Sequence, residues 1–118
     1  MTKISWLTEP EEHDYPAAES FLLLLFPAPQ VNKIITNLQA AKNVTFKAKD
    51  VFRASGLSLL GVSNSHVAKD SEKIKSGKAL SPILLVRDGG RLIIADGYHR
   101  MCAVYAEDED ADIPCRIV

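Results

Sequence analysis

Apolar residues in the N-terminal third of the chain recur with the spacing of two helices. The first is predicted over residues 15–26 and includes Phe21–Phe26, a run that is apolar on every side. The second is predicted over residues 30–41, after Pro27 and Pro29 have ended the first. Its apolar residues at i, i+3, i+4 and i+7 are Val31, Ile34, Ile35 and Leu38. The pattern predicts a helical hairpin that either covers a sheet or joins two copies of the chain, and the all-apolar run favours a homodimer slightly.

An acidic cluster precedes this hairpin. It consists of Glu9, Glu11, Glu12 and Asp14. The Asp14 carboxylate is predicted to cap the first helix by accepting from its free main-chain N–H groups. The cluster as a whole is interpreted as a solvated approach to the helix, with a metal site or a general base as the alternative.

From residue 44 onward, the apolar pattern alternates between strands and helices. The predicted elements are a strand at 44–48, a helical turn at 50–55, a helix at 66–75, a strand at 82–87, a return strand at 91–95, a helix at 97–106 and a strand at 113–118. Asp88-Gly89-Gly90 supplies the hairpin turn between the two middle strands. We therefore expect residues 83–86, 92–95 and 113–118 in one sheet, with the helix at 97–106 packed against it.

Length and composition indicate one ordinary globular domain. The chain has 118 residues, 47% of them hydrophobic. We divide it into an N-terminal arm and hairpin (1–43) and a core (44–118). A net charge of −1 gives no general attraction to nucleic acid or to a membrane surface. The two cysteines form neither a disulfide framework nor a metal-binding pair, and no signal peptide or membrane-spanning run is found, so a cytoplasmic protein is expected.

The stretch Ile93–Ala103 predicts a buried strand, a sharp turn and the start of a helix. Asp96 is predicted to cap that helix, and Gly97 would let a ligand approach the main chain closely. The helix start carries partial positive charge, to which Arg100 and His99 add. The pattern predicts an anion site at Asp96, Gly97, Tyr98, His99 and Arg100, and the alternative is a plain strand-to-helix turn. The lysines of the helix at 66–75 matter only if they border this turn.

Metal and thiol chemistry are not predicted. The three histidines, His13, His66 and His99, have no mutual metal-ligand spacing, although folding could bring them together. Cys102 lies among core residues of the last helix and is interpreted as a buried, inert thiol.

The segments PILLV, RLIIADGYHRMCAVY and DIPCRIV resemble the ParB/sulfiredoxin superfamily. The resemblance covers roughly residues 63–118, and small stand-alone bacterial ParB-like proteins have similar IADGYHR and IPCRIV segments. It implies an α/β fold in which helices pack on a mixed sheet, to which the N-terminal helical hairpin is an addition.

The resemblance also implies a function for the turn. In ParB the corresponding Gly-Glu-Arg-Arg turn binds nucleotide phosphates; Gly97 and Arg100 match it, and Tyr98 replaces the glutamate. In sulfiredoxin the catalytic cysteine stands where Tyr98 does, so that activity is not expected here. In a related free serine kinase an acidic residue precedes the glycine, as Asp96 does. ParB-type DNA binding is not expected, because no helix-turn-helix domain follows within this chain.

Together these features predict a domain that binds a nucleotide or another phosphorylated small molecule. ATP, ADP or CTP with Mg²⁺ would be the ligand implied by the resemblance, which also allows phosphoryl transfer. Asp96 and His99 are then the candidate catalytic residues, and no protein metal site is predicted. The alternative is a non-catalytic interaction or regulatory module that keeps the fold without the chemistry.

Overall fold

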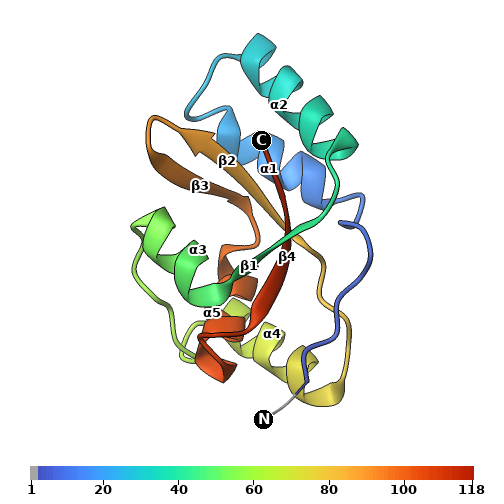
Figure 1. Ribbon diagram of the computed structural model, residues 1–118, viewed down its shortest axis with the longest axis vertical. Coiled ribbons are helices and arrows are strands. Elements are labelled where there is room, and N and C mark those ends of the chain that lie inside the picture. The colour runs from blue at the N-terminus through green and yellow to red at the C-terminus, as the bar shows by residue number, and fades with distance from the viewer. Residues whose placement is uncertain (1–2) are drawn as a thin grey trace.

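The computed structural model describes residues 3–118. Within that range it is a compact α/β protein of five helices and an open, four-stranded mixed sheet, about 42 × 26 × 24 Å (Figure 1). The helices are α1 (Asp14–Leu22), α2 (Ala28–Ala40), α3 (Ala48–Ser55), α4 (Ser65–Ser76) and α5 (Tyr98–Glu107). The strands are β1 (Val44–Lys47), β2 (Ile83–Asp88), β3 (Arg91–Asp96) and β4 (Asp112–Ile117).

The sheet has the order β1-β4-β2-β3, so β4 lies inside it. β4 pairs antiparallel with β1 and parallel with β2, and Cys115 stands opposite Val44 on one side and Ile83 on the other. β2 and β3 form the predicted hairpin, closed by Gly89 and Gly90 at positive φ. The predictions that three strands share one sheet and that α5 packs against it are confirmed.

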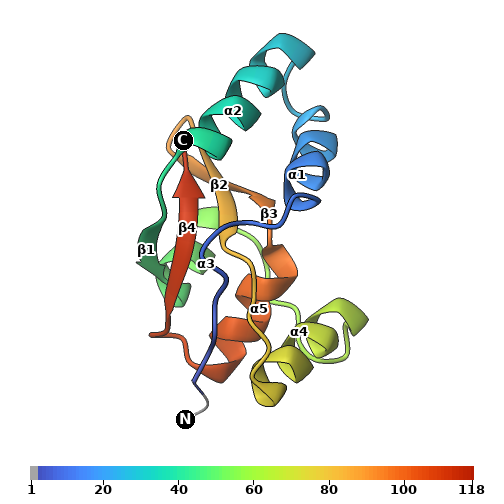
Figure 2. The same cartoon turned by 90° about the vertical axis from the view of Figure 1, so that its right-hand side faces the viewer.

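Both faces of the sheet are covered by helices, and an apolar cluster fills each side. On one face α1 and α2 bury Ala18, Leu22, Val31, Ile35 and Leu38 against Leu84, Val86, Ile93 and Ala95. On the other face α3, α4 and α5 pack against a cluster that includes Ile83, Leu85 and Ile94. Figure 2 shows the α1–α2 hairpin at one end of the molecule and α4 at the other. The hairpin therefore covers the sheet, one of the two arrangements expected from the sequence, while its use as a dimer contact remains a prediction.

The end of α1 differs from the prediction, because the helix stops at Leu22 instead of Phe26. The residues that follow form turns with hydrogen bonds three or four residues apart, as in Leu24 N–H to Phe21 O and Phe26 N–H to Leu22 O. Pro27 cannot continue a helix and disfavours helical geometry in the residue before it. The next helix starts earlier than predicted, at Ala28, since Pro29 falls in the first turn, where no N–H is needed. The break leaves Leu24 83% exposed.

Other boundaries lie within two residues of the prediction. The first strand ends at Lys47 because α3 already begins at Ala48. Among residues 3–118, every helix is too short or too polar to span a membrane.

Candidate functional site

The turn between β3 and α5 is built around Gly97. Its φ is +108°, in the region that favours glycine. A Cβ at this position would lie 2.8 Å from Ile83 Cγ1 and 2.9 Å from Arg100 Nη2. The space beside Gly97 is thus filled by the protein itself. The glycine is needed so that the turn can pack on β2. Gly97 also lines the cavity described below, so a close approach of a ligand to its main chain remains a prediction.

Asp96 and Arg100 form an ion pair beside this turn. The Arg100 Nη2 donates to Asp96 Oδ2 at 2.9 Å, and both side chains are about 15% exposed (16% and 15%). The predicted cap by Asp96 is wrong: the N-cap residue is Gly97, and within residues 3–118 no side chain hydrogen-bonds to cap the helix. One residue at positive φ separates Asp96 from the helix, and the carboxylate pairs with the side chain four residues on instead.

Arg100 is also tied to the chain before β2. Its Nε donates to the Ser81 main-chain oxygen at 3.0 Å, and Nη2 donates to that of Pro82 at 3.2 Å. The guanidinium therefore holds the protein together at this turn. A bound anion would have to rely chiefly on other cationic groups.

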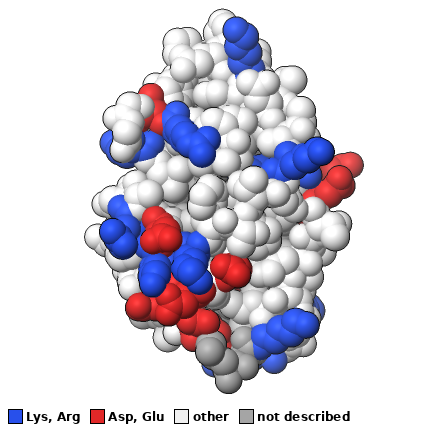
Figure 3. Space-filling view, in the orientation of Figure 1, with Lys and Arg blue, Asp and Glu red and all other residues white. Residues whose placement is uncertain are grey.

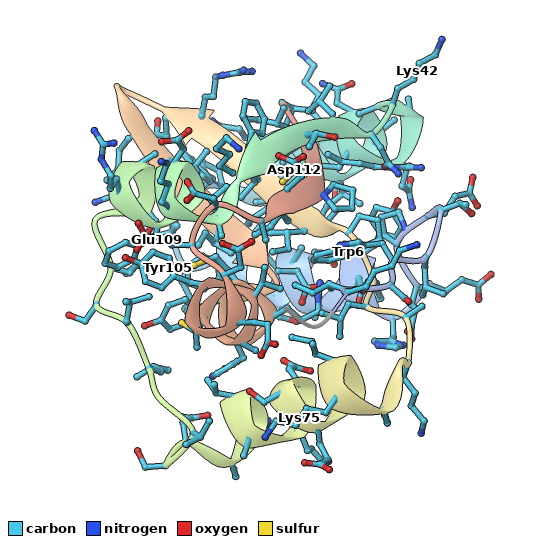
Figure 4. All side chains as sticks on the ribbon, turned by 60° about the horizontal axis from the view of Figure 1, so that its bottom comes forward. Trp6, Lys42, Lys75, Tyr105, Glu109 and Asp112 are labelled. Atoms are coloured by element: carbon cyan, nitrogen blue, oxygen red, sulfur yellow. The ribbon has the colours of Figure 1, made fainter. Side chains whose placement is uncertain are left out.

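Those other groups come from α4. A cavity of about 290 Å³ lies between α4 and the start of α5. Its lining residues are His66, Lys69, Asp70, Lys73, Asp96, Gly97, His99 and Arg100. The first four stand at i, i+3, i+4 and i+7, which is one face of a helix. Figure 4 shows α4 next to α5, which is viewed nearly end-on while α4 runs across the picture; Lys75, a lysine outside the lining set, is labelled on α4.

The lysines of α4 are relevant only if they border the turn at residues 96–100, and two of them do. Lys69 and Lys73 border the turn, whereas Lys75 and Lys78 do not. Lys73 Nζ lies 3.9 Å from Asp70 Oδ1, a distance at which the pair is weak. Within the part of the chain that the structure describes, Lys69 forms no ion pair. Its charge is available to a ligand.

Two carboxyls in the cavity are disfavoured as anions. Burial raises the pKa of Asp70, and the charges of Lys73 and Arg100 oppose the rise. Burial also raises the pKa of Asp96; Arg100 opposes this rise, and the Asp14 carboxylate adds to it. When ionised, these carboxylates accept hydrogen bonds from hydroxyl donors and repel an anion placed next to them, so an anion in the cavity would raise their pKa further.

Asp14 reaches the same region from the start of α1. It is 2% exposed, and its Oδ2 accepts from Ser81 Oγ at 2.6 Å and from the Glu11 main-chain N–H at 2.9 Å. The predicted helix cap by Asp14 is therefore wrong, as is a fully solvated acidic cluster. The partner that buries this carboxylate lies 67 residues away in the sequence, so no local pattern could have indicated it.

Tyr98 and Cys102 lie away from the cavity. The Tyr98 hydroxyl donates to the Ser58 main-chain oxygen, on the side of the α3–α4 connection. Cys102 is 1% exposed, its Sγ accepts from the Leu60 main-chain N–H at 3.5 Å, and burial raises its pKa. The interpretation of Cys102 as a buried thiol is confirmed. Tyr98 is the only residue of the predicted set Asp96–Arg100 that does not line the cavity.

Folding brings two of the three histidines together. The rings of His66 and His99 have centroids 4.9 Å apart, whereas His13 lies near Glu11 and Asp14 in the arm. Across residues 3–118, no group of three or more His, Cys, Asp or Glu side chains is placed to hold a metal ion.

A second concentration of charge lies on the face shown in Figure 3, where basic and acidic side chains intermix. Lys49 Nζ is 2.7 Å from Asp110 Oδ1, and Lys47 lies 3.9 Å from Asp112. These exposed pairs neutralise one another, so this face is not a candidate anion site.

Comparisons of the chain with protein-family models, with curated proteins and with solved structures find no match.

Proposed function

We propose that this protein binds a phosphorylated small molecule, such as a nucleotide, in the cavity between α4 and α5. One observation carries the proposal: the uncapped start of α5 lines the same cavity as Lys69 and Lys73. Main-chain N–H groups at a helix start favour an anion, and a lysine one helix away supplies full positive charge. His66 and His99 add ring N–H donors.

The arrangement of β2, β3, α5 and β4 supports the resemblance to the ParB/sulfiredoxin superfamily, and we propose membership in it. We limit the proposal to binding. In phosphoryl transfer Asp96 would hold Mg²⁺ or accept a proton, and its carboxylate is already paired with Arg100. Two buried free cysteines fit a reducing compartment, so we also propose a cytoplasmic protein.

The experiment measures binding of inorganic tripolyphosphate, ATP, ADP and CTP, with and without Mg²⁺, by calorimetry and thermal shift. A true ligand at 100 times its Kd should stabilise the fold by about 2.7 kcal/mol. Lys69→Ala should weaken binding by roughly 1.5–3 kcal/mol, the value of a hydrogen bond to a charged group. Lys75→Ala is the matched control, since Lys75 is exposed on the same helix outside the cavity. Equal effects of the two variants, or no wild-type binding, would refute the proposal.

A second function is favoured by the apolar side chains that are exposed where the chain passes from α1 to α2. Phe21, Leu23, Leu24 and Leu25 are each more than 40% exposed, an apolar group that a monomer rarely leaves in water. The alternative proposal is an interaction module that dimerises through the N-terminal helices. Sedimentation should then show a dimer at micromolar concentration and a monomer for Leu24→Glu. A wild-type monomer at high micromolar concentration would remove this alternative.

A further inference from the structure

A second cavity lies between α3 and the sheet. It has a volume of about 220 Å³ and shares no lining residue with the cavity between α4 and α5. Its apolar walls come from α3 and from all four strands, and they are Phe46, Val51, Ala54, Leu85, Leu92 and Ile117. Two charged residues, Asp50 and Arg87, complete the lining. A concave, mostly apolar site with few polar groups is the usual form of a small-molecule site.

The apolar walls of this cavity are not fully covered by the protein. Phe46, Leu92 and Ile117 come from three different strands, and each is only half-buried. A ligand with an apolar body would remove their remaining surface from water, which is favourable. An apolar cavity of about 150 Å³ can hold benzene, so this one suits a single ring or a branched chain of roughly six to eight carbon atoms.

Arg87 places a positive charge beside these apolar walls. Successive side chains of a strand point to opposite faces, so Arg87 lies on the same face of β2 as Leu85, the face that α3 covers. Its main chain is fixed by the Arg87 N–H, which donates to Val118 O at 2.8 Å. Within residues 3–118 its guanidinium forms no ion pair. This charge is therefore available to a ligand in the cavity.

Asp50, the other charged lining residue, already faces a cation. Arg53 Nη1 lies 3.7 Å from Asp50 Oδ1, one turn along α3. The pair is exposed and weak, but it offsets the negative charge that Asp50 would present to a bound anion. The charge left without a partner in the lining is thus that of Arg87.

We propose that this cavity binds a small monocarboxylate whose apolar body is one ring or a short branched chain. The apolar body fills the space between α3 and the sheet. The carboxylate pairs with the Arg87 guanidinium, whose planar N–H groups match the two carboxylate oxygens. Because Arg87 is exposed, the carboxylate stays at the solvent side of the cavity. This site is separate from the proposed phosphate site and does not depend on it.

The first experiment varies the head group on one apolar body. The probes are phenylacetate, its neutral amide phenylacetamide and the cation phenethylamine, with acetate as the carboxylate that lacks the body. The wild type should bind phenylacetate about fivefold more tightly than phenylacetamide, the upper end of what an exposed ion pair contributes. Phenethylamine should bind more weakly than phenylacetamide, and acetate should not bind. Titrations followed by calorimetry and by main-chain amide NMR measure the affinities.

The second experiment uses variants to locate the site. Arg87→Gln should lower phenylacetate affinity to that of phenylacetamide, and Arg91→Gln, at an exposed arginine outside this cavity, is the matched control. Ala54→Leu should fill the cavity and weaken binding of both probes about tenfold. Leucine is a good helix former and Ala54 is an exposed position of α3, so the fold should tolerate it. Lys69→Ala should change nothing, which separates this site from the cavity at α4. Melting curves check that each variant is folded.

Three results would overturn the proposal. If Arg87→Gln and Arg91→Gln have equal effects, or if Ala54→Leu leaves phenylacetate binding intact, the probe binds elsewhere on the protein. If phenylacetamide or phenethylamine binds as tightly as phenylacetate, the cavity takes apolar bodies without regard to a carboxylate. If none of the probes binds at millimolar concentration, the cavity is not a site for this class of ligand, and the phosphate proposal is unaffected because the two cavities share no residue.

Discussion

The Gly97→Ala substitution should destabilise the protein for two separable reasons. An L-residue in a left-handed conformation costs about 1–2 kcal/mol. The added methyl group would also be 2.8 Å from Ile83 Cγ1, so either the side chain or the turn must move. Overpacking of this kind costs about 1–3 kcal/mol. The expected loss in free energy of unfolding from these two costs is about 2–5 kcal/mol. Arg100 Nη2 would also have to move, which would weaken its hydrogen bonds to Pro82 and Asp96 and add to the loss.

Gly77→Ala supplies the matched control. Gly77 also has positive φ, +78°, but a Cβ there would meet nothing within 4 Å. Its loss should be only the conformational cost, about 1–2 kcal/mol. Urea unfolding followed by circular dichroism and by the fluorescence of Trp6, the single tryptophan, measures both variants.

A double-mutant cycle tests the contact directly. Ile83→Ala removes the atoms that the new methyl group would meet, so the loss in the double variant should be smaller than the sum of the two single losses. If Gly97→Ala costs no more than Gly77→Ala, or if the cycle shows no coupling, the packing of the turn on Ile83 is not what requires glycine.

Arg100→Ala should lower the free energy of unfolding by about 2–4 kcal/mol in urea titrations, since it leaves the Asp96 carboxylate and two carbonyls without their donor; a change below 0.5 kcal/mol would contradict this. Because burial raises the pKa of Asp70, its ionisation opposes folding, and Asp70→Asn should be more stable than the wild type at neutral pH. That gain should vanish below pH 3.8, the ordinary pKa of aspartate, where the carboxyl is protonated in both states; a gain independent of pH would count against it. Cys102 and Cys115 are buried, and burial raises the pKa of Cys115 to about 12, so a thiol reagent should label both only as fast as the protein unfolds.

The elements that sequence analysis predicted well depend on neighbouring residues. The β2–β3 hairpin follows from two apolar runs around Gly89-Gly90, and α5 follows from an apolar face just after a glycine. The end of α1 was misplaced because the all-apolar run Phe21–Phe26 outweighed the effect of Pro27 on the residues before it. A run without polar residues gives no sign of where a helix stops.

The candidate site could be predicted only in part, because its side chains contact residues that are far away in the sequence. The turn at residues 96–100 was located correctly as a strand-to-helix junction, but the roles of its side chains depend on distant partners. Asp14 bonds to Ser81, and Arg100 to Ser81 and Pro82, across gaps that no local spacing reveals. The spacing of Lys69 and Lys73 on one helical face was readable, whereas their approach to the turn depends on how α4 packs on α5.

The interior position of β4 has a consequence for synthesis of the chain. Every other element in Figure 1 precedes β4, yet β1 and β2 pair with it and not with each other. While the ribosome has not yet released residues 112–117, β1 has no strand partner and one edge of β2 stays open. The helical hairpin and the β2–β3 ribbon can form early from local contacts, but the complete sheet must wait for β4. A nascent chain that stalls before β4 would therefore expose open strand edges, which makes this the stage of synthesis most prone to aggregation.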